Sequence, residues 1–220
     1  MTKLFIFGDS SFAIIAKEYF ERDGKFVEGF VVEDNYKKTN ELEGKPVFKL
    51  STVLKDFDRN SYMFFVAVVY TQVNKLRTRI YENLVKEGFK PISYISPNSF
   101  IDPTSIIGDH VFIFENNVIQ AFTEIGDNTI LWSGNHIGHH SVVGKNNFFS
   151  SHVVLSGHCK TGLNCFFGVN SSINNNLNVG DFNWVMPKVN IHVNTKENEI
   201  WQGERAKKFP KSTKDFFKID

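Results

Sequence analysis

The chain lacks most of the features that assign a protein to a specialised class. Only two cysteines occur in 220 residues, Cys159 and Cys165, which excludes a disulfide framework and a four-cysteine zinc site. We expect both to be small residues of an interior wall. The 25 Lys and Arg balance 24 Asp and Glu without a basic block, so neither nucleic acid nor membrane is favoured as a partner.

A long apolar run is also missing at the N-terminus. The first apolar run of the chain ends at Phe7 and is followed by Gly8 and Asp9. It is too short for a signal peptide or a membrane span. We therefore expect a cytoplasmic protein.

The first ninety residues alternate short apolar runs with helical patterns, which predicts a small parallel sheet built from β-α-β units. The expected strands are 4–7, 27–32, 63–70 and 92–95, and the expected helices are 10–20 and 72–86.

From Ile95 onward every sixth residue is apolar, with Thr161 as the one exception. The positions are Ile95, Ile101, Ile107, Ile113, Ile119, Ile125, Leu131, Ile137, Val143, Phe149, Leu155, Thr161, Phe167, Ile173, Val179, Val185 and Ile191. Neither a helical period nor a simple strand period places residues in this way. A chain wound into a prism, with one short strand per face, puts every sixth side chain inside. The repeat therefore predicts a parallel β-helix.

A second register, three residues later, indicates the corners of the prism. Eleven of its fourteen members are Asn, His or Gly, which tolerate the positive φ of a tight corner. They are His110, Asn116, Phe122, Asn128, Gly134, His140, Asn146, His152, His158, Asn164, Asn170, Asn176, Phe182 and Lys188. Three faces of six residues make an 18-residue coil. We expect the N-terminal sheet to cover one open end, and residues 206–220 to cover or skirt the other.

The segment from Ile137 to Gly144, IGHHSVVG, resembles the catalytic segment of the hexapeptide-repeat sugar acyltransferases, of the sialic-acid O-acetyltransferase and bacillosamine-pathway N-acetyltransferase type. The resemblance covers nearly the whole chain. It implies a Rossmann-like nucleotide- or sugar-binding domain (1–95), a left-handed parallel β-helix acyltransferase domain (96–194) and a C-terminal tail (195–220). It further implies a homotrimer that uses acetyl-CoA as co-substrate and a nucleotide-linked amino-deoxysugar of a bacterial surface polysaccharide.

The resemblance aligns His139 with a histidine that acts as general base. In this sequence His139 shares an outward-facing polar register with residues such as Asp109 and Asp127, so folding does not call for an imidazole there. An imidazole that titrates near neutrality suits proton removal from an attacking amine or hydroxyl. His140 stands where the family has an acidic residue that orients the base. Asn135 and His136 are other groups that could orient it.

Gly157 lies one coil after His139 and, by the same resemblance, supplies a backbone N–H to the oxyanion and to CoA. A plain close contact between coils is the structural alternative. The segment from Gly203 to Lys208 resembles the Gly-x-Pro-Ala-Lys ending of the family, with Arg205 in place of the proline. The basic side chains Arg205, Lys207 and Lys208 could meet the phosphates of CoA. A solvated charge run is the alternative there.

The substrate is expected at Gly8, Ser10, Ser11, Glu33, Asp34 and His136. Gly8, Ser10 and Ser11 join a strand to a helix, where backbone N–H groups favour a phosphate; the serines would otherwise cap the helix. Glu33 and Asp34 resemble an acidic pair that contacts a nucleotide, or form an exposed turn.

Two other functions stay open. Histidines 18 residues apart, His140 and His158, could bind metal in a hydratase of the β-helix carbonic-anhydrase type. The paired histidines of that class, with four residues between them, are absent, so we expect no metal. A non-catalytic or ice-binding β-helix would need threonines repeated along one face, and these are missing too.

Overall fold

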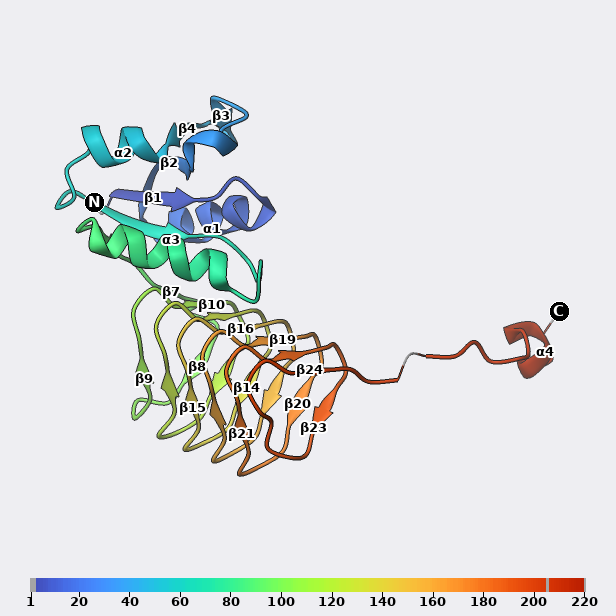
Figure 1. Ribbon diagram of the computed structural model, residues 1–220. Coiled ribbons are helices and arrows are strands. Elements are labelled where there is room, and N and C mark those ends of the chain that lie inside the picture. The colour runs from blue at the N-terminus through green and yellow to red at the C-terminus, as the bar shows by residue number, and fades with distance from the viewer. Residues whose placement is uncertain (1–2, 205, 220) are drawn as a thin grey trace.

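A computed structural model describes residues 3–204 and 206–219 of the chain. It shows a small α/β unit beside a long triangular prism, from which the C-terminal residues extend (Figure 1). No helix in the described ranges is long and apolar enough to cross a membrane.

The N-terminal half forms one sheet with the strand order β3-β4-β2-β1-β5-β6. All neighbouring strands are parallel except the β3–β4 pair. The strands are β1 (Lys3–Phe7), β2 (Phe26–Val32), β3 (Glu41–Leu42), β4 (Lys45–Lys49), β5 (Tyr62–Val66) and β6 (Lys90–Pro91). The helices are α1 (Ser11–Arg22), the short 3-10 turn η1 (Asp34–Tyr36), α2 (Leu50–Asp56) and α3 (Lys75–Lys86).

The parallel sheet expected from the sequence is confirmed, with two differences. The hairpin β3–β4 and helix α2 had not been recognised in the polar stretch between residues 41 and 56. The strand expected at 63–70 ends at Val66, and of the strand expected at 92–95 only Tyr94–Ile95 forms, as the first strand of the prism.

The prism consists of three parallel sheets, which we call the first, second and third faces. The first face contains β7 (Tyr94–Ile95), β10 (Phe112–Ile113), β13 (Ile130–Leu131), β16 (Phe148–Phe149), β19 (Phe166–Phe167), β22 (Trp184–Val185) and β24 (Ile200–Trp201). The second contains β8 (Phe100–Ile101), β11 (Val118–Ile119), β14 (His136–Ile137), β17 (Val154–Leu155), β20 (Ser172–Ile173) and β23 (Asn190–Ile191). The third contains β9 (Ile106–Ile107), β12 (Glu124–Ile125), β15 (Val142–Val143), β18 (Lys160–Thr161) and β21 (Asn178–Val179).

The six-residue repeat lies inside the prism as expected. Ile125 pairs with Ile107 on one side and with Val143 on the other, 18 residues apart in each case. From Ile113 to Ile191 every member of the repeat is buried, and the two cysteines are buried beside it. Burial raises the pKa of the Cys165 thiol to about 12, so this cysteine is an unreactive wall residue at neutral pH.

The corner register is confirmed at all fourteen positions. Thirteen of them are non-glycine residues with φ between 55° and 64°, and the fourteenth, Gly134, has φ 78°. Left-handed backbone costs a side chain little only for residues such as Asn and His. The corner geometry therefore accounts for four of the seven histidines and for six of the asparagines of this half.

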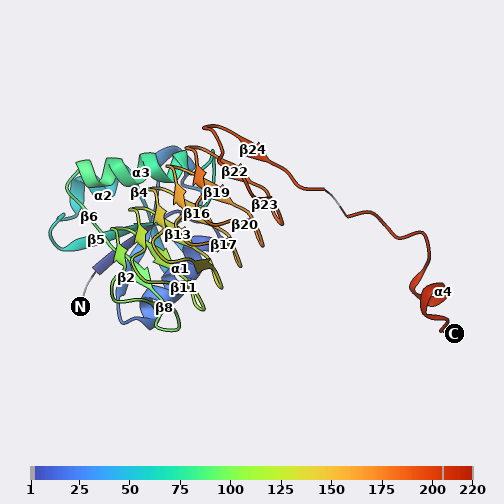
Figure 2. The same cartoon turned by 90° about the horizontal axis from the view of Figure 1, so that it is seen from below.

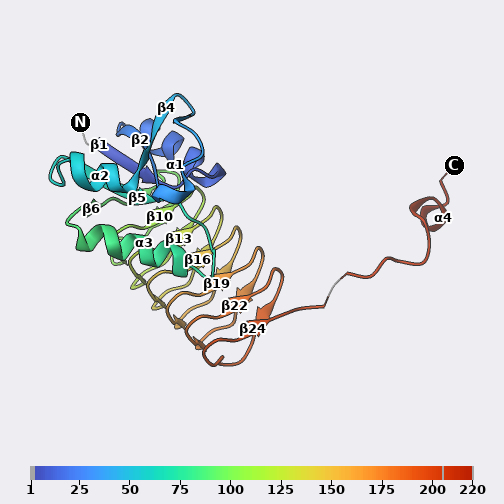
Figure 3. The same ribbon diagram turned by 45° about the horizontal axis from the view of Figure 1, so that its top comes forward.

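The N-terminal sheet does not cover an end of the prism; that expectation is wrong. One apolar core joins Leu4, Ile6, Phe12 and Phe65 to outward-facing residues of the first face, namely Phe112, Phe114, Ile130 and Phe148. The sheet therefore lies along the side of the first coils (Figure 3). Ile95, at the start of the prism, is 41% exposed. The outward residues of the first face are apolar, so burying them under the N-terminal sheet removes more apolar surface from water than covering the end of the prism would.

The C-terminal tail does not cover the other end either. Residues 206–219 extend away from the last coil and finish in the short helix α4 (Thr213–Phe217) (Figures 1 and 2). The aromatic side chains Phe209, Phe216 and Phe217 are exposed in this single chain. The division of the chain at residues 95 and 194 stays a prediction, and the strands of the prism run from Tyr94 to Trp201.

Candidate active site

The edge between the second and third faces carries three imidazoles, and we call it the histidine edge. His139 and His140 follow strand β14 after one residue, Gly138, and His158 occupies the corner that matches His140 one coil later. His140 and His158 both have φ 57°, so their corner role is confirmed. His139 precedes the corner and its backbone N–H donates to the side chain of Gln120 at 3.0 Å, which fixes the main chain beneath the ring.

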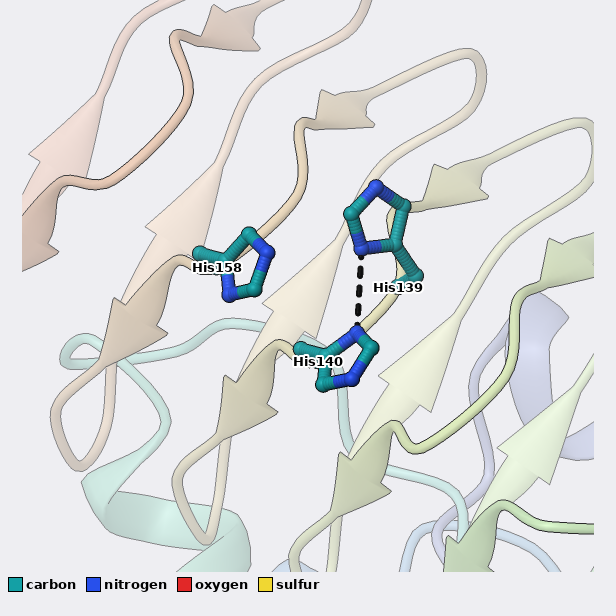
Figure 4. A group of neighbouring side chains, drawn as sticks. All are labelled: His139, His140 and His158. Atoms are coloured by element: carbon teal, nitrogen blue, oxygen red, sulfur yellow. Dashed lines mark hydrogen bonds between the residues drawn. The ribbon is translucent and has the colours of Figure 1, made fainter.

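The three side chains lie close together at this edge (Figure 4). The Nδ1 atoms of His139 and His140 lie 3.1 Å apart, within hydrogen-bond range. The rings of His140 and His158 are stacked, with centroids 4.8 Å apart and 19° between planes. All three residues are exposed. The structure thus brings His139 and His140 together, and it stacks His158 on His140, the pair that the 18-residue spacing had placed on one edge.

Gly157 lies directly beneath the His139 ring. A Cβ built on Gly157 would fall 2.9 Å from Cε1 and 3.0 Å from Nε2 of His139, which is closer than real Cβ contacts come. The glycine therefore makes room for the imidazole. Its N–H is not free, however, because it donates to the Asn175 side chain at 2.9 Å. In this structure Gly157 is a space-making residue, and its N–H lacks the freedom that an oxyanion donor needs.

Asn175 was missed by the sequence interpretation, although a signal was present. It lies 18 residues after Gly157. The same bond recurs one edge away, where Asp127 accepts from the N–H of Asp109 and Asp181 from that of Leu163. In this prism, a polar side chain one coil later repeatedly accepts a hydrogen bond from a backbone N–H that precedes a corner.

The other histidines do not join the cluster. His136 is half-buried on the outward side of the second face, between Val118 and Val154 in the ladder. His152 stands at a corner of a different edge. His110 is buried at the edge between the third and first faces. The substrate role expected of His136 stays a prediction.

His110 belongs to what we call the α3 edge, the row of corners His110, Asn128, Asn146 and Asn164 on which helix α3 lies. The Val66 N–H donates to His110 Nε2 at 2.8 Å, and His110 Nδ1 lies 2.9 Å from Asn128 Oδ1. Burial, and secondarily the nearby Arg77, lowers the pKa of His110 to about 3. The ring is therefore a neutral structural group at pH 7.

Arg77 is fully buried between α3 and this edge. Its guanidinium donates to the carbonyls of Val68, Val69, Asn128, Asn146 and Asn147 and to the side chains of Asn74 and Asn128. Burial lowers its pKa to about 9, which keeps the group protonated at neutral pH. Neutral acceptors alone thus hold one buried charge, and that charge fixes the N-terminal half to the prism.

A cavity of about 230 Å³ opens at the carboxyl ends of β1, β2 and β5. Gly8 and Glu33 line it together with Arg79, and Arg79 binds Glu33 through two hydrogen bonds of 2.8 and 2.9 Å. This ion pair lowers the pKa of Glu33. Gly8 has φ 124°, a conformation that side chains avoid, so a glycine is needed where the chain turns into the cavity.

The other expected substrate residues face elsewhere. Asp34 accepts from the backbone N–H of Ser51 at 3.0 Å and from its hydroxyl, so it stabilises the start of α2. Ser10 is the N-cap residue of α1 but its side chain makes no cap bond. Ser11 lines a second cavity of about 360 Å³ between α1 and the first face, which Trp132 and Phe148 also line.

The expected CoA-binding basic residues lie on the tail. Lys207 and Lys208 are exposed on the segment that leaves the last coil. Arg205 lies outside the described residues. In the single chain neither lysine is near the histidine edge, and their role stays a prediction.

The comparisons with known proteins agree with this architecture. The family model described as bacterial transferase hexapeptide (six repeats) matches residues 104–139 and 122–157, a stretch that includes His139, His140 and Gly157. No curated protein sequence matches the chain.

Solved structures share the fold over almost the whole chain. PerB from Caulobacter crescentus, in complex with CoA and GDP-perosamine, is 21% identical, with 91% of this chain and 93% of that chain covered and a TM-score of 0.81. The acetyltransferase domain of PglB from Neisseria gonorrhoeae is also 21% identical, with coverage of 91% and 96% and a TM-score of 0.81. WeeI from Acinetobacter baumannii is 14% identical, with coverage of 91% and 96% and a TM-score of 0.65.

These similarities confirm the expected fold class, a Rossmann-like sheet followed by a left-handed parallel β-helix. The chain carries the bacterial transferase hexapeptide repeat and shares its two-part fold with PerB and with the acetyltransferase domain of PglB.

Proposed function

We propose that the protein transfers an acetyl group from acetyl-CoA to the amino group, or the hydroxyl, of a nucleotide-linked amino-deoxysugar. The observation that carries this proposal is the exposed imidazole of His139, held beside His140 and over a glycine on an edge where folding requires no imidazole. The solved structures that share the fold include one with CoA and GDP-perosamine bound, which supports this choice of substrates.

His139 acts as the general base in this proposal. A sugar amine must lose a proton as it attacks the thioester, and Nε2 of His139 can accept it if Nδ1 carries the ring hydrogen. Nδ1 then donates to Nδ1 of His140, 3.1 Å away, which fixes the tautomer. His140 thus does the orienting work of a carboxylate. As a neutral acceptor it stabilises the resulting imidazolium less than a carboxylate would.

The oxyanion needs a donor that is free in the transition state. The Gly157 N–H can serve only when Asn175 gives up its 2.9 Å bond. We propose that the bound thioester displaces the exposed Asn175 side chain, which exchanges one hydrogen bond for another.

We assign the nucleotide of the sugar to the cavity at the carboxyl ends of β1, β2 and β5. In open parallel sheets, ligands bind outside the carboxyl ends of strands where the strand order reverses, and here β1 has β2 on one side and β5 on the other. Gly8, Glu33 and Arg79 line this cavity, and Lys207 and Lys208 are proposed to meet the phosphates of CoA.

We propose that the protein is a homotrimer, which fits this division of roles. The N-terminal half covers the first face and the α3 edge, whereas His139 lies on the edge made by the second and third faces. In a three-sided prism that edge is opposite the first face. A sugar held by the N-terminal half therefore meets the His139 of a neighbouring copy, not its own.

Acyl transfer is favoured over the metal-dependent hydratase because two of the solved structures that share the fold are a CoA complex of PerB and the acetyltransferase domain of PglB. We further propose that the reaction takes place in the cytoplasm, where acetyl-CoA and nucleotide sugars are both available.

The deciding experiment measures free thiol released from acetyl-CoA with a panel of GDP-, UDP- and dTDP-linked amino sugars. His139→Asn should lower kcat by about 10²- to 10⁴-fold, the usual contribution of a general base. His152→Asn, a histidine at a corner of another edge, is the matched control and should keep full turnover. Wild-type turnover in His139→Asn would show that His139 is not the base.

A further inference from the structure

The three imidazoles of the histidine edge lie close enough to hold one ion. His139, His140 and His158 each offer a ring nitrogen, and these nitrogens all lie within 4.8 Å of one another. We propose that the edge binds one divalent transition-metal ion of the zinc class, and that the bound ion blocks acyl transfer. The second half of this proposal rests on the proposed function; the first half does not.

The spacing of the first two ligands fits a tetrahedral ion. Two imidazole nitrogens, each about 2.0–2.1 Å from Zn²⁺, lie roughly 3.4 Å apart at the tetrahedral angle. Nδ1 of His139 and Nδ1 of His140 are already 3.1 Å apart. The ion would replace the hydrogen that these two atoms share.

His158 completes the set after a rotation of its ring. It is stacked on His140 with centroids 4.8 Å apart, which is close to the distance between neighbouring strands. Parallel stacked rings cannot both aim at one ion in their planes, so the His158 side chain has to turn toward His139. The ring is exposed, and no hydrogen bond within the described residues holds it in place.

The type of donor selects the type of metal. Three imidazoles without a carboxylate suit Zn²⁺, Co²⁺, Ni²⁺ or Cu²⁺, whereas Mg²⁺ and Ca²⁺ prefer oxygen ligands. No ion pair within residues 3–204 and 206–219 engages any of the three histidines. A fourth position on the ion would face solvent and take a water.

Occupation by metal is incompatible with the proposed role of His139. When Nδ1 of a neutral imidazole binds a metal, the ring hydrogen resides on Nε2, and Nε2 can no longer accept a proton. The ion is thus an inhibitor in this proposal and no part of the reaction. Excess zinc would turn the enzyme off, and a chelator would restore it.

Binding is tested first, by titrating chelator-treated protein with Zn²⁺ in a calorimeter and with Co²⁺ while recording its visible absorption. We expect one ion per chain, and at least tenfold weaker binding in His140→Asn and in His158→Asn. Asparagine occupies equivalent corners elsewhere in the prism, so both variants should fold. His152→Asn makes the same change at an exposed corner of another edge and should bind as the wild type does. Absence of binding in the wild type, or an equal loss in His152→Asn, would overturn the site.

Inhibition is tested second, by measuring the acetylated sugar by mass spectrometry, because zinc also binds thiols. The wild type should lose activity over the zinc concentrations at which it binds the ion. His158→Asn should be active without metal and resist zinc at least tenfold better. Zinc-sensitive activity in His158→Asn would overturn the blocking role. Wild-type protein that is inactive even without metal would refute the proposed function and the blocking role together, while the binding result would stand.

Discussion

Two edges of one prism use the same corner residues for opposite purposes. On the α3 edge, His110, Asn128 and Asn164 are buried and Asn146 is half-buried, and their polar atoms meet Arg77, Val66 and one another. On the histidine edge, His140 and His158 have the same positive φ as His110 but face solvent. Backbone geometry explains why Asn or His stands at a corner. The groups packed outside the corner decide whether an imidazole is structural or available for chemistry.

The largest expected effect concerns the charge buried on the α3 edge. Arg77→Met would remove the Arg77 donor from the carbonyls of Asn128 and Asn146 and would leave the Asn147 carbonyl with the Ile130 N–H alone. We expect the free energy of unfolding to fall by about 3–5 kcal/mol, as for other broken buried networks. Urea denaturation at a fixed chain concentration measures it.

Arg79→Met is the matched control, two residues further along the same helix. Arg79 is exposed, and within the described part of the chain its side chain bonds to Glu33 alone, so its loss should cost less than about 1 kcal/mol. Equal losses in the two variants would mean that Arg77 does not hold the two halves together, and the contrast between the edges would lose its physical basis.

The second prediction concerns pH. Burial lowers the pKa of His110 to about 3, below the value of about 6.5 for an unfolded histidine. The unfolded chain therefore binds a proton below pH 6.5 that the native chain does not, and stability falls as the pH falls. Between pH 7 and pH 5 this one group should remove about 2 kcal/mol of stability.

The check is the urea midpoint at pH 7 and pH 5 for the wild type, His110→Asn and His152→Asn. His110→Asn should be less stable at pH 7, because it loses the acceptor for the Val66 N–H and the ring stacked on Phe65, and it should lose that part of the pH dependence. His152→Asn should keep the wild-type slope. An unchanged slope in His110→Asn would show that the buried ring is not the titrating group.

The interior and the corners of the prism could be predicted from sequence because each depends on one residue and its own backbone. The six-residue period places Ile125 in the interior of the prism, regardless of what packs against the outside of the coil. How the two halves pack could not be predicted in that way, because it depends on side chains far apart in the chain. A signal existed: stepping by 18 from Tyr94 gives Phe112, Ile130, Phe148, Phe166 and Trp184, an outward apolar column that marks the covered face.

The same distinction applies to the candidate site: what depends on one residue could be predicted, and what depends on distant side chains could not. His139 could be identified as a candidate base from its register, because the other positions of that register hold ordinary polar residues and folding does not require an imidazole there. Whether the Gly157 N–H is free or hydrogen-bonded could not be predicted from the sequence, because this depends on the rotamer of Asn175 one coil away. Glu33 and Asp34, adjacent in sequence, have different partners, Arg79 and Ser51, and only the folded chain separates them.

The smallest expected effect compares two equivalent bonds on the two sides of the third face. Asn175→Ala removes the partner of the Gly157 N–H, and Asp181→Ala removes the partner of the Leu163 N–H. Each should lower the free energy of unfolding by about 1 kcal/mol, the usual net value of one hydrogen bond. The rate of acyl transfer should distinguish the two variants. If the Gly157 N–H stabilises the oxyanion, Asn175→Ala frees this N–H before the thioester binds, so kcat is kept or raised. Asp181→Ala should leave kcat unchanged. A tenfold fall of kcat in Asn175→Ala, with its fold intact, would instead mean that the Asn175 amide meets the reacting carbonyl and that the role of Gly157 ends with making room for the base.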